Sequence, residues 1–184
     1  MLASRKHSQL MIVDVQQKLA PHVDRHIAIV ENCQRLIRYA LRLGVPVTIT
    51  EHYPEGLGHT VATLRAAAGN EASTLEKITF SCLNDHAIAA RLREQRARDR
   101  TQVVVAGMEA HVCVGQTVLD LLDNEFEVFV VADAVGSRSP DVCRLALERM
   151  ARKGAHIVSH EMVAFEWLGR GDTAEFKDLI GVIK

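Results

Sequence analysis

The chain has 184 residues, of which 22 are Lys or Arg and 23 are Asp or Glu, so its formal net charge is −1. Hydrophobic residues make up 48%, as in an ordinary globular domain, which excludes extended disorder and predicts a single domain over residues 1–184. The balanced charge disfavours a nucleic-acid-binding protein, and the apolar runs fall far short of the roughly 20 residues that span a bilayer.

Five short runs of apolar and β-branched residues predict strands buried within a sheet. They cover residues 10–15, 45–50, 102–107, 127–132 and 156–158. Strands that are apolar on both faces are typical of a parallel sheet that helices cover on both sides.

Segments with apolar residues at helical spacing alternate with these strands. The first runs from residue 27 to residue 41 and is followed by Gly44, a typical helix C-cap. The second begins near Ile88 and continues to Arg100, and others cover residues 114–122, 142–150 and 173–183. This alternation predicts an α/β fold, a three-layer α/β/α sandwich with a mostly parallel, Rossmann-like sheet. Residues 53–80 have weak periodicity and are expected to form a long loop that carries function.

Ligands of an open parallel sheet bind at the carboxyl ends of its strands, so the residues that follow the predicted strands are candidates for a site. Asp14 interrupts the apolar run LMIVDV, and is either a turn cap or a partly desolvated carboxylate that can accept a proton. Cys113 stands where a strand gives way to a helix, and the helix dipole there favours the thiolate. The alternative for Cys113 is a small buried hydrophobic residue.

Lys77 is the third candidate. A lysine is most often solvated, but an inward-pointing Lys77 would stabilise the anionic forms of Asp14 and Cys113. A thiol, a carboxylate and an ammonium group are what a nucleophile, a base and an electrostatic partner require. Their spacing in the sequence does not by itself bring them together.

Five sequence blocks in a fixed order extend over nearly the whole chain: IVDVQ, TEHYPEGLG, EKITFSC, GMEAHVCVGQTVLDLL and VVADAVGSRS. They resemble those of the isochorismatase-like cysteine hydrolases, a family that includes nicotinamidases and N-carbamoylsarcosine amidases. The resemblance implies a catalytic triad of Asp14, Lys77 and Cys113. It also implies a cis peptide bond between Met108 and Glu109, and an oxyanion hole made by the backbone N–H groups of Glu109 and Cys113.

The function implied by the resemblance is cysteine-dependent hydrolysis of a small amide, ureide or related C–N substrate through a thioester. We expect His52 and Tyr53 to contact this small-molecule substrate, no cofactor to be required, and the chain to form a homo-oligomer. The alternative is a scaffold, regulatory or redox-sensing protein that retains the hydrolase fold with little or no turnover.

Nicotinamidases of this family bind a metal through an Asp-x-His unit and a further histidine. The corresponding residues here are Thr50, Glu51 and His52, followed by His59. Thr50 replaces the first carboxylate, and Glu51 points to the opposite face of the strand from His52. No bound metal is therefore expected.

The cysteines and the first residues bear on the cellular compartment. The four cysteines are Cys33, Cys82, Cys113 and Cys143, and they form no C-x-x-C pair. The opening MLASRKHSQL lacks the apolar core of a secretory signal. A cytoplasmic protein with reduced thiols is expected.

Overall fold

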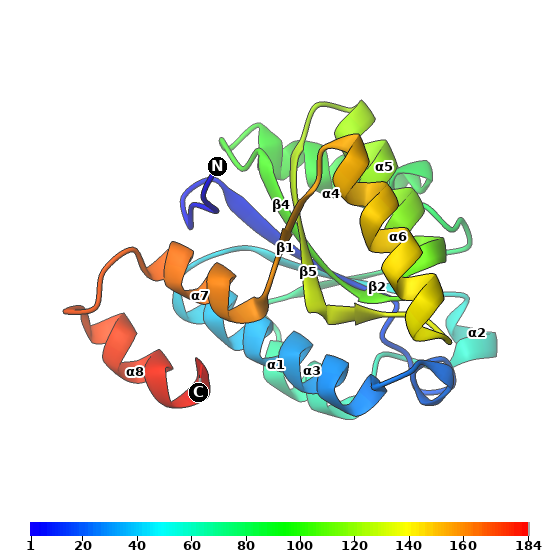
Figure 1. Ribbon diagram of the computed structural model, residues 1–184, viewed down its shortest axis with the longest axis horizontal. Helices are drawn as coiled ribbons and strands as arrows, with labels where there is room; N and C mark the ends of the chain where they lie inside the picture. Colours follow the sequence, from blue (N-terminus) through cyan, green and yellow to red (C-terminus); the bar gives the residue numbers. More distant parts are fainter. Residues whose placement is uncertain (184) are drawn as a thin grey trace.

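The fold is built on one six-stranded sheet in the computed structural model, which describes residues 1–183 (Figure 1). The strands are β1 (Ser8–Val13), β2 (Val47–His52), β3 (Ser73–Lys77), β4 (Gln102–Met108), β5 (Glu127–Gly136) and β6 (His156–Val158). Neighbouring strands are all parallel, in the order β3-β2-β1-β4-β5-β6. The predicted α/β sandwich is confirmed. Residue 184, the last of the expected domain, lies outside the described residues.

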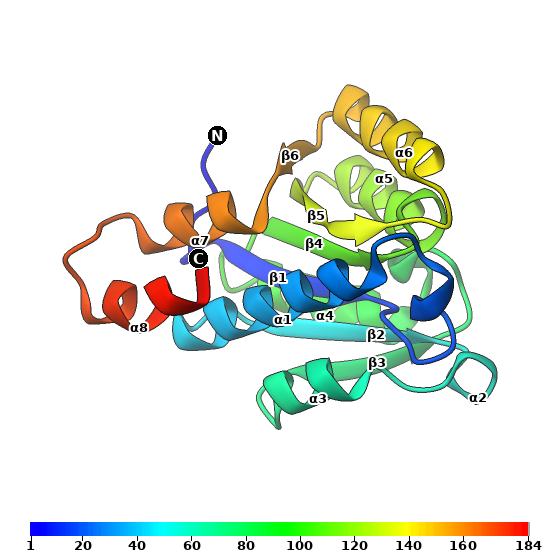
Figure 2. The same cartoon turned by 60° about the horizontal axis from the view of Figure 1, so that its bottom comes forward.

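Helices cover both faces of the sheet (Figures 1 and 2). On one face lie α1 (His26–Arg42), α3 (Ala62–Ala68) and α7 (His160–Leu168), with α8 (Ala174–Ile183) packed on α1 and α7. On the other face lie α4 (His86–Arg96), α5 (Gly115–Asp123) and α6 (Pro140–Lys153). None of the helices within residues 1–183 combines the length and apolar character that crossing a bilayer requires.

Alternate side chains of β1 enter two separate cores. Leu10 and Ile12 pack on the α1 side of the sheet, whereas Met11 and Val13 pack on the side of α4 and α5. All four are at most 1% exposed, which explains why the strand is apolar without interruption.

Several predicted boundaries of strands and helices were wrong. β1 ends at Val13 because Asp14 turns the chain with a φ of 50°, and β2 continues to His52 instead of stopping at residue 50. The helix α4 ends at Arg96 rather than Arg100, in a turn where Asp99 has a φ of 66°.

The long loop expected over residues 53–80 is also wrong in part. This stretch holds α2 (Pro54–Leu57), α3 and β3. β3 lies at the edge of the sheet, and its side chains alternate between partly buried and exposed until Lys77, so it lacks the apolar run of the central strands. The helix α7 was not predicted either.

The order of the strands reverses between β1 and β4. From β1 the chain moves outward through α1 to β2, and from β4 it moves the other way through α5 to β5. The carboxyl ends of β1 and β4 therefore flank the crevice where such sheets bind ligands. A Cβ atom on Gly107, whose φ is 122°, would clash with the Val13 carbonyl oxygen, so glycine permits the close approach of the two strands here.

Candidate active site

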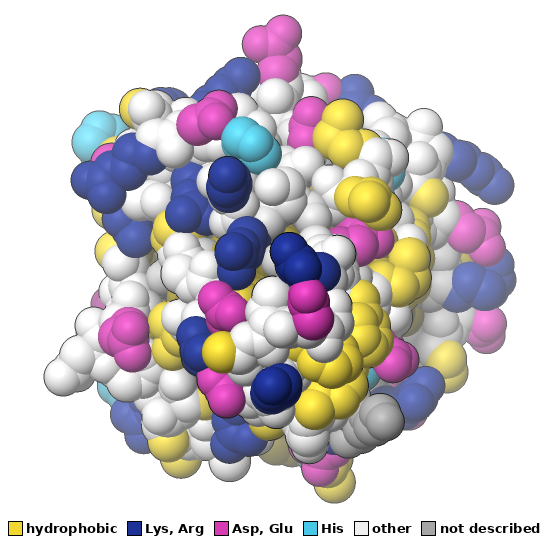
Figure 3. Space-filling view, turned by 90° about the vertical axis from the view of Figure 1, so that its left-hand side faces the viewer, with side chains coloured by type: hydrophobic (Ala, Val, Ile, Leu, Met, Phe, Trp, Pro, Cys, Tyr) yellow, Lys and Arg dark blue, Asp and Glu magenta, His cyan; other side chains and the backbone are white. Residues whose placement is uncertain are grey.

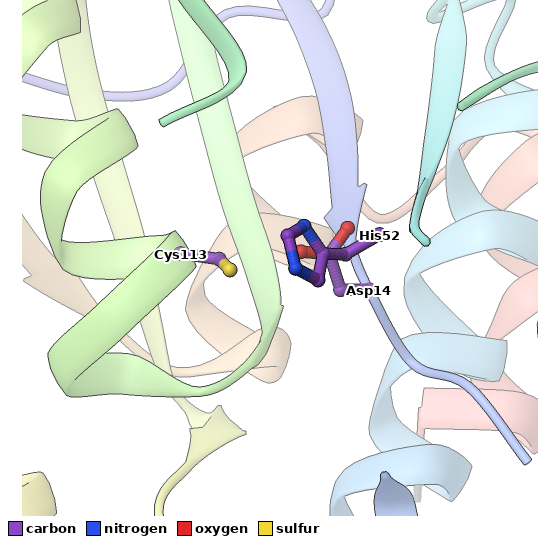
Figure 4. Close-up of side chains that lie close together, drawn as sticks. All are labelled: Asp14, His52 and Cys113. Carbon is purple, nitrogen blue, oxygen red and sulfur yellow. The ribbon is translucent and has the colours of Figure 1, made fainter. Parts of the chain in front are cut away.

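The carboxyl ends of β1 and β4 bring the expected base and the expected nucleophile together. Asp14 directly follows β1, and Cys113 lies in η3 (Ala110–Val114), a π-helical turn between β4 and α5. Figure 4 shows the side chains of Asp14, His52 and Cys113 gathered in one place, and their donor atoms lie within 4.8 Å of one another. A thiol and a carboxylate this close can exchange a proton through a direct hydrogen bond or one bridging water.

Asp14 is buried, and hydrogen bonds hold both its backbone N–H and its carboxylate. Its backbone N–H donates to the Thr50 carbonyl (3.1 Å), and its left-handed backbone is a conformation that aspartate tolerates better than most residues. The carboxylate oxygen Oδ2 accepts from Lys77 Nζ at 2.6 Å, and Oδ1 accepts from Thr50 Oγ1 at 2.6 Å. A buried carboxylate is stable only with partners of this kind.

Lys77 is the last residue of β3 and supplies the positive charge of the site. Burial is the largest single influence and would lower the pKa of Lys77, but the charge and hydrogen bond of Asp14, together with the nearby Cys82 and Cys113, outweigh it, and the net direction is upward. The ammonium group also donates to the Thr79 carbonyl at 3.1 Å, and its side chain is not exposed. Lys77 is therefore a buried cation, not a solvated one.

The thiol of Cys113 is more difficult to ionise than the sequence predicted. Burial raises the pKa of Cys113, the charge and hydrogen bonding of Asp14 raise it further, and Lys77 only partly opposes them. The expected gain from a helix N-terminus is overridden because this wide turn buries the side chain to 6% exposure. A Cβ atom on Gly115 would lie 2.8 Å from the Ala110 carbonyl oxygen, so this turn needs glycine.

Glu109 lies between β4 and the turn that carries Cys113. The peptide bond between Met108 and Glu109 is cis, as the resemblance implied. The buried Glu109 carboxylate accepts from Arg138 Nε at 2.9 Å and from Nη2 at 3.1 Å. This bidentate contact fixes Glu109, which precedes the nucleophile by four residues in the chain.

His52 enters the same crevice as a neutral imidazole. Burial lowers the pKa of His52, and the nearby charge of Lys77 lowers it further. Its ring stacks on Phe80 with the centroids 5.6 Å apart, and its Nδ1 finds no hydrogen-bond partner among residues 1–183. A buried ring nitrogen that lacks a partner close to Cys113 is free to bond a bound molecule.

The second histidine of the metal-binding pattern lies elsewhere. His59 Nδ1 contacts Glu51 Oε2 at 2.8 Å, and the Thr60 backbone N–H donates to Glu51 Oε1 at 2.6 Å. Glu51 and His59 therefore fix the loop after α2, and the acidic, histidine and cysteine side chains grouped at the site are Asp14, His52 and Cys113.

The remaining donor set does not fit a resident divalent metal. Asp14, His52 and Cys113 have suitable donor atoms, but the Asp14 carboxylate already holds the Lys77 ammonium group at 2.6 Å. A second cation at Asp14 would be repelled by the first. No step of the chemistry considered below uses a metal.

Three exposed side chains form an apolar rim beside the site: Tyr53, Ile78 and Phe80, which are 48%, 69% and 52% exposed. Tyr53 follows β2 and its N–H donates to the Lys77 carbonyl at 2.9 Å, which places it next to the end of β3. Sequence analysis identified Tyr53 but missed Ile78 and Phe80. The signal was present in EKITFSC, where these two residues follow Lys77 directly.

Comparison with known proteins places this chain in a known family. The isochorismatase domain model matches residues 8–162. Isochorismatase family protein 1B of Dictyostelium discoideum is 34% identical over 180 residues, which are 96% of this chain and 86% of that protein.

Solved structures give the same result. The structure of the MAR1 ribonuclease from Caenorhabditis elegans has a TM-score of 0.92 and 33% identity, covering 100% of this chain and 92% of that one. The YcaC gene product of Escherichia coli, described as an octameric hydrolase of unknown specificity, has a TM-score of 0.90 over 99% of this chain and 90% of its own. At 23% identity, the latter supports the shared fold alone.

Proposed function

Since this chain belongs to the isochorismatase-like hydrolase family, we propose that it hydrolyses the C–N bond of a small amide or ureide through a thioester on Cys113. The observation that carries the proposal is the buried ion pair of Asp14 and Lys77 beside the Cys113 thiol. Taking two charges out of water is unfavourable, and this pair lies at the point of the sheet where ligands bind.

In the first half of the proposed reaction, the sulfur is ionised as it attacks. Because the pKa of Cys113 is raised, its proton moves to the Asp14 carboxylate while sulfur bonds to the substrate carbonyl carbon. The oxygen of that carbonyl takes the electron pair and accepts hydrogen bonds from the backbone N–H groups of Glu109 and Cys113. When the C–N bond breaks, Asp14 returns the proton to the leaving nitrogen.

In the second half, water replaces the amine. Asp14 takes a proton from water, the resulting hydroxide adds to the thioester carbon, and the C–S bond breaks to release the acid. The proton on Asp14 then returns to sulfur. Lys77 keeps its proton throughout and balances the charge of Asp14 whenever that carboxylate is ionised.

The surroundings of the site favour a small, partly apolar substrate. The apolar rim offers contact to a hydrocarbon or planar group, and the neutral His52 offers one hydrogen bond. A relative named as a ribonuclease makes RNA the competing substrate. RNA binding depends on a basic surface, whereas this chain has a net charge of −1.

We also propose that the chain forms a homo-oligomer and works in the cytoplasm. The E. coli neighbour is described as an octamer, and α7 exposes Met162 and Phe165, at 48% and 41%, on a side where hydrophobic side chains gather (Figures 1 and 3). All four cysteines are free, as a reducing compartment would keep them.

The proposed function is tested by screening small amides, ureides, vinyl ethers and an RNA oligonucleotide with the wild-type chain and two variants. We expect Cys113→Ala to lose activity by about 10³-fold or more, and Cys143→Ala, a half-buried thiol on α6, to retain it. Mass spectrometry of a rapidly quenched reaction should find the acyl group on Cys113.

Three outcomes would contradict the proposal. Turnover by Cys113→Ala at the wild-type rate would show that Cys113 is not the nucleophile. Cleavage of the RNA oligonucleotide and of no other compound would make RNA the substrate in place of an amide or ureide. Peroxide oxidation of Cys113 without turnover of any compound would favour the redox-sensing alternative.

A further inference from the structure

Thr50 is a buried polar residue at the site for which the reaction described above has no role. It lies in β2 opposite Val13, the residue before Asp14, and has no solvent exposure. Its Oγ1 donates to Asp14 Oδ1 at 2.6 Å, while its carbonyl accepts from the Asp14 N–H at 3.1 Å. Thr50 thus holds both the backbone and the side chain of the proposed base.

The direction of the Thr50 hydroxyl proton follows from its neighbours. The Cys82 thiol, whose pKa burial raises to about 11, lies with its sulfur 3.9 Å from Thr50 Oγ1 and points its hydrogen toward it. An ionised Asp14 carboxylate can only accept, so the Thr50 proton is directed to Oδ1. The β-branched side chain restricts rotation about χ1, which keeps this donor in place.

The two oxygens of Asp14 are therefore held by different donors. Lys77 binds Oδ2 and Thr50 binds Oδ1, each at 2.6 Å. With Lys77 alone, the carboxylate plane can turn about its bond to Cβ, because a single ammonium contact does not fix a plane. With both donors the plane is fixed, and the lone pairs that remain free keep one orientation relative to Cys113.

We propose that Thr50 is a positioning residue that orients the Asp14 carboxylate for proton transfer from Cys113. The inference rests on the proposed function, since it assigns Thr50 to the base of that reaction. Thr50 also favours the ionised carboxylate, because its hydrogen bond is stronger to a charged acceptor than to a neutral one. Loss of the hydroxyl should then slow proton transfer. In the pH profile of the rate, the decline on the acid side should move to higher pH.

The test measures the second-order rate at which iodoacetamide alkylates Cys113, mapped by peptide mass spectrometry from acid to neutral pH. This readout needs no substrate, because alkylation also requires the thiol to lose its proton. The variants are Thr50→Ser and Thr50→Ala, which differ by one hydroxyl, with Thr50→Val as the variant closest in shape. Labelling of Cys143 in the same samples is the internal control.

We expect Thr50→Ala and Thr50→Val to slow Cys113 labelling about tenfold at neutral pH and to move the acid limb upward. Thr50→Ser should restore the rate to within about threefold of the wild type, with its acid limb unmoved. If Thr50→Val fails to fold, the Ser and Ala pair still decides the role of the hydroxyl.

Two results would overturn the inference. One is wild-type labelling and pH dependence in Thr50→Ala. The other is equal slowing in the Ser and Ala variants, which would assign Thr50 to packing. Turnover by Asp14→Asn separates this from the proposed function: loss of turnover there with normal labelling in Thr50→Ala defeats only the role of Thr50, whereas wild-type turnover in Asp14→Asn defeats the base itself.

Discussion

Cys113 and Cys33 lie in two buried regions that share the same chemical groups. In each, burial is the main cause that raises the thiol pKa, and a nearby aspartate adds to it: Asp14 beside Cys113 and Asp133 beside Cys33. Each aspartate also has a basic partner, Lys77 for Asp14 and His160 for Asp133. A list of residues or of pKa directions would not tell the two regions apart.

Hydrogen-bond direction and access distinguish them. Both oxygens of Asp133 are taken by one residue, through the backbone N–H of His160 at 2.9 Å and its Nδ1 at 2.6 Å. Cys33 is completely buried and its thiol donates to the Ala134 carbonyl at 3.5 Å. The Cys113 thiol instead lies within 4.8 Å of a carboxylate oxygen of Asp14, beside the exposed apolar rim. A thiol beside a carboxylate becomes a candidate nucleophile only when the carboxylate is aimed at it and a substrate can enter.

The largest effect should come from removing the buried cation. Lys77→Met leaves the buried Asp14 charge without its cationic partner, and we expect the free energy of unfolding to fall by about 3–5 kcal/mol in urea titrations. The double variant Asp14→Asn/Lys77→Met should recover most of that stability and none of the activity.

The matched change in the other region is His160→Ala. The Asp133 side chain is 37% exposed, so water can replace the lost partner and the loss of stability should be smaller. Equal losses in Lys77→Met and His160→Ala would mean that the two ion pairs do not differ as described.

Thiol labelling compares the cysteines directly. In the folded protein at neutral pH, iodoacetamide should alkylate Cys113 at least about 100 times faster than Cys33, because only Cys113 combines an aimed proton acceptor with access. Since the pKa of Cys113 is raised, its thiolate fraction grows only toward alkaline pH. Wild-type and Cys113→Ala proteins should therefore show the same thiolate absorbance in the ultraviolet at neutral pH.

Two results would contradict the claim that Cys113 is a protonated thiol that reacts faster than Cys33. A thiolate signal that disappears with Cys113→Ala at neutral pH would restore the sequence-based expectation of an ionised cysteine. Comparable labelling of Cys33 and Cys113 would erase the distinction between the regions.

Asp14 and Cys113 could be identified from the sequence because ligands bind at the carboxyl ends of parallel strands, and both residues come after long apolar runs that belong to central strands. Lys77 ends β3, an edge strand with alternating exposure, so the sequence offered it only as one of three candidates, and the resemblance of EKITFSC was needed to assign its role. The α/β class was predictable for the same reason as the central strands: burial on both faces leaves a continuous pattern.

Properties that depend on side-chain direction could not be predicted. In the sequence, Thr50 is one more β-branched residue of a predicted strand. Its hydrogen bond to Asp14 can be recognised only once the register of β1 and β2 is known. For Cys113, the helix-terminus rule predicted a lowered pKa, but the depth of the turn, which no local pattern encodes, made burial the larger effect.

A moderate effect is expected from Asp133→Asn. Burial is the largest single influence and would raise the pKa of Asp133, but the hydrogen bonds and charge of His160, with a further backbone hydrogen bond, together hold that pKa below the usual value. A carboxylate with a lowered folded-state pKa contributes stability that is complete above about pH 4 and is lost as the pH falls through the folded value. Asp133→Asn should therefore reduce stability by about 1 kcal/mol at neutral pH and flatten its decline in acid.

Urea unfolding of Asp133→Asn and the wild type over a series of pH values tests this sign. The stability difference should shrink toward acid; a difference that grows there would contradict it. Cys33 labelling should stay slow in Asp133→Asn, because lowering the thiol pKa provides no route for the reagent.

The smallest effect concerns the apolar rim, which Cys113 has and Cys33 lacks. Phe80→Ala removes an exposed ring that stacks on His52, and we expect KM for the amide found in the screen to rise about fivefold with kcat nearly unchanged. Phe165→Ala on α7, where the ring is 41% exposed, is the control and should alter neither constant. If Phe80→Ala lowers kcat alone, or if both variants raise KM equally, the rim does not contact the substrate. Access to Cys113 would then have to be explained by another surface.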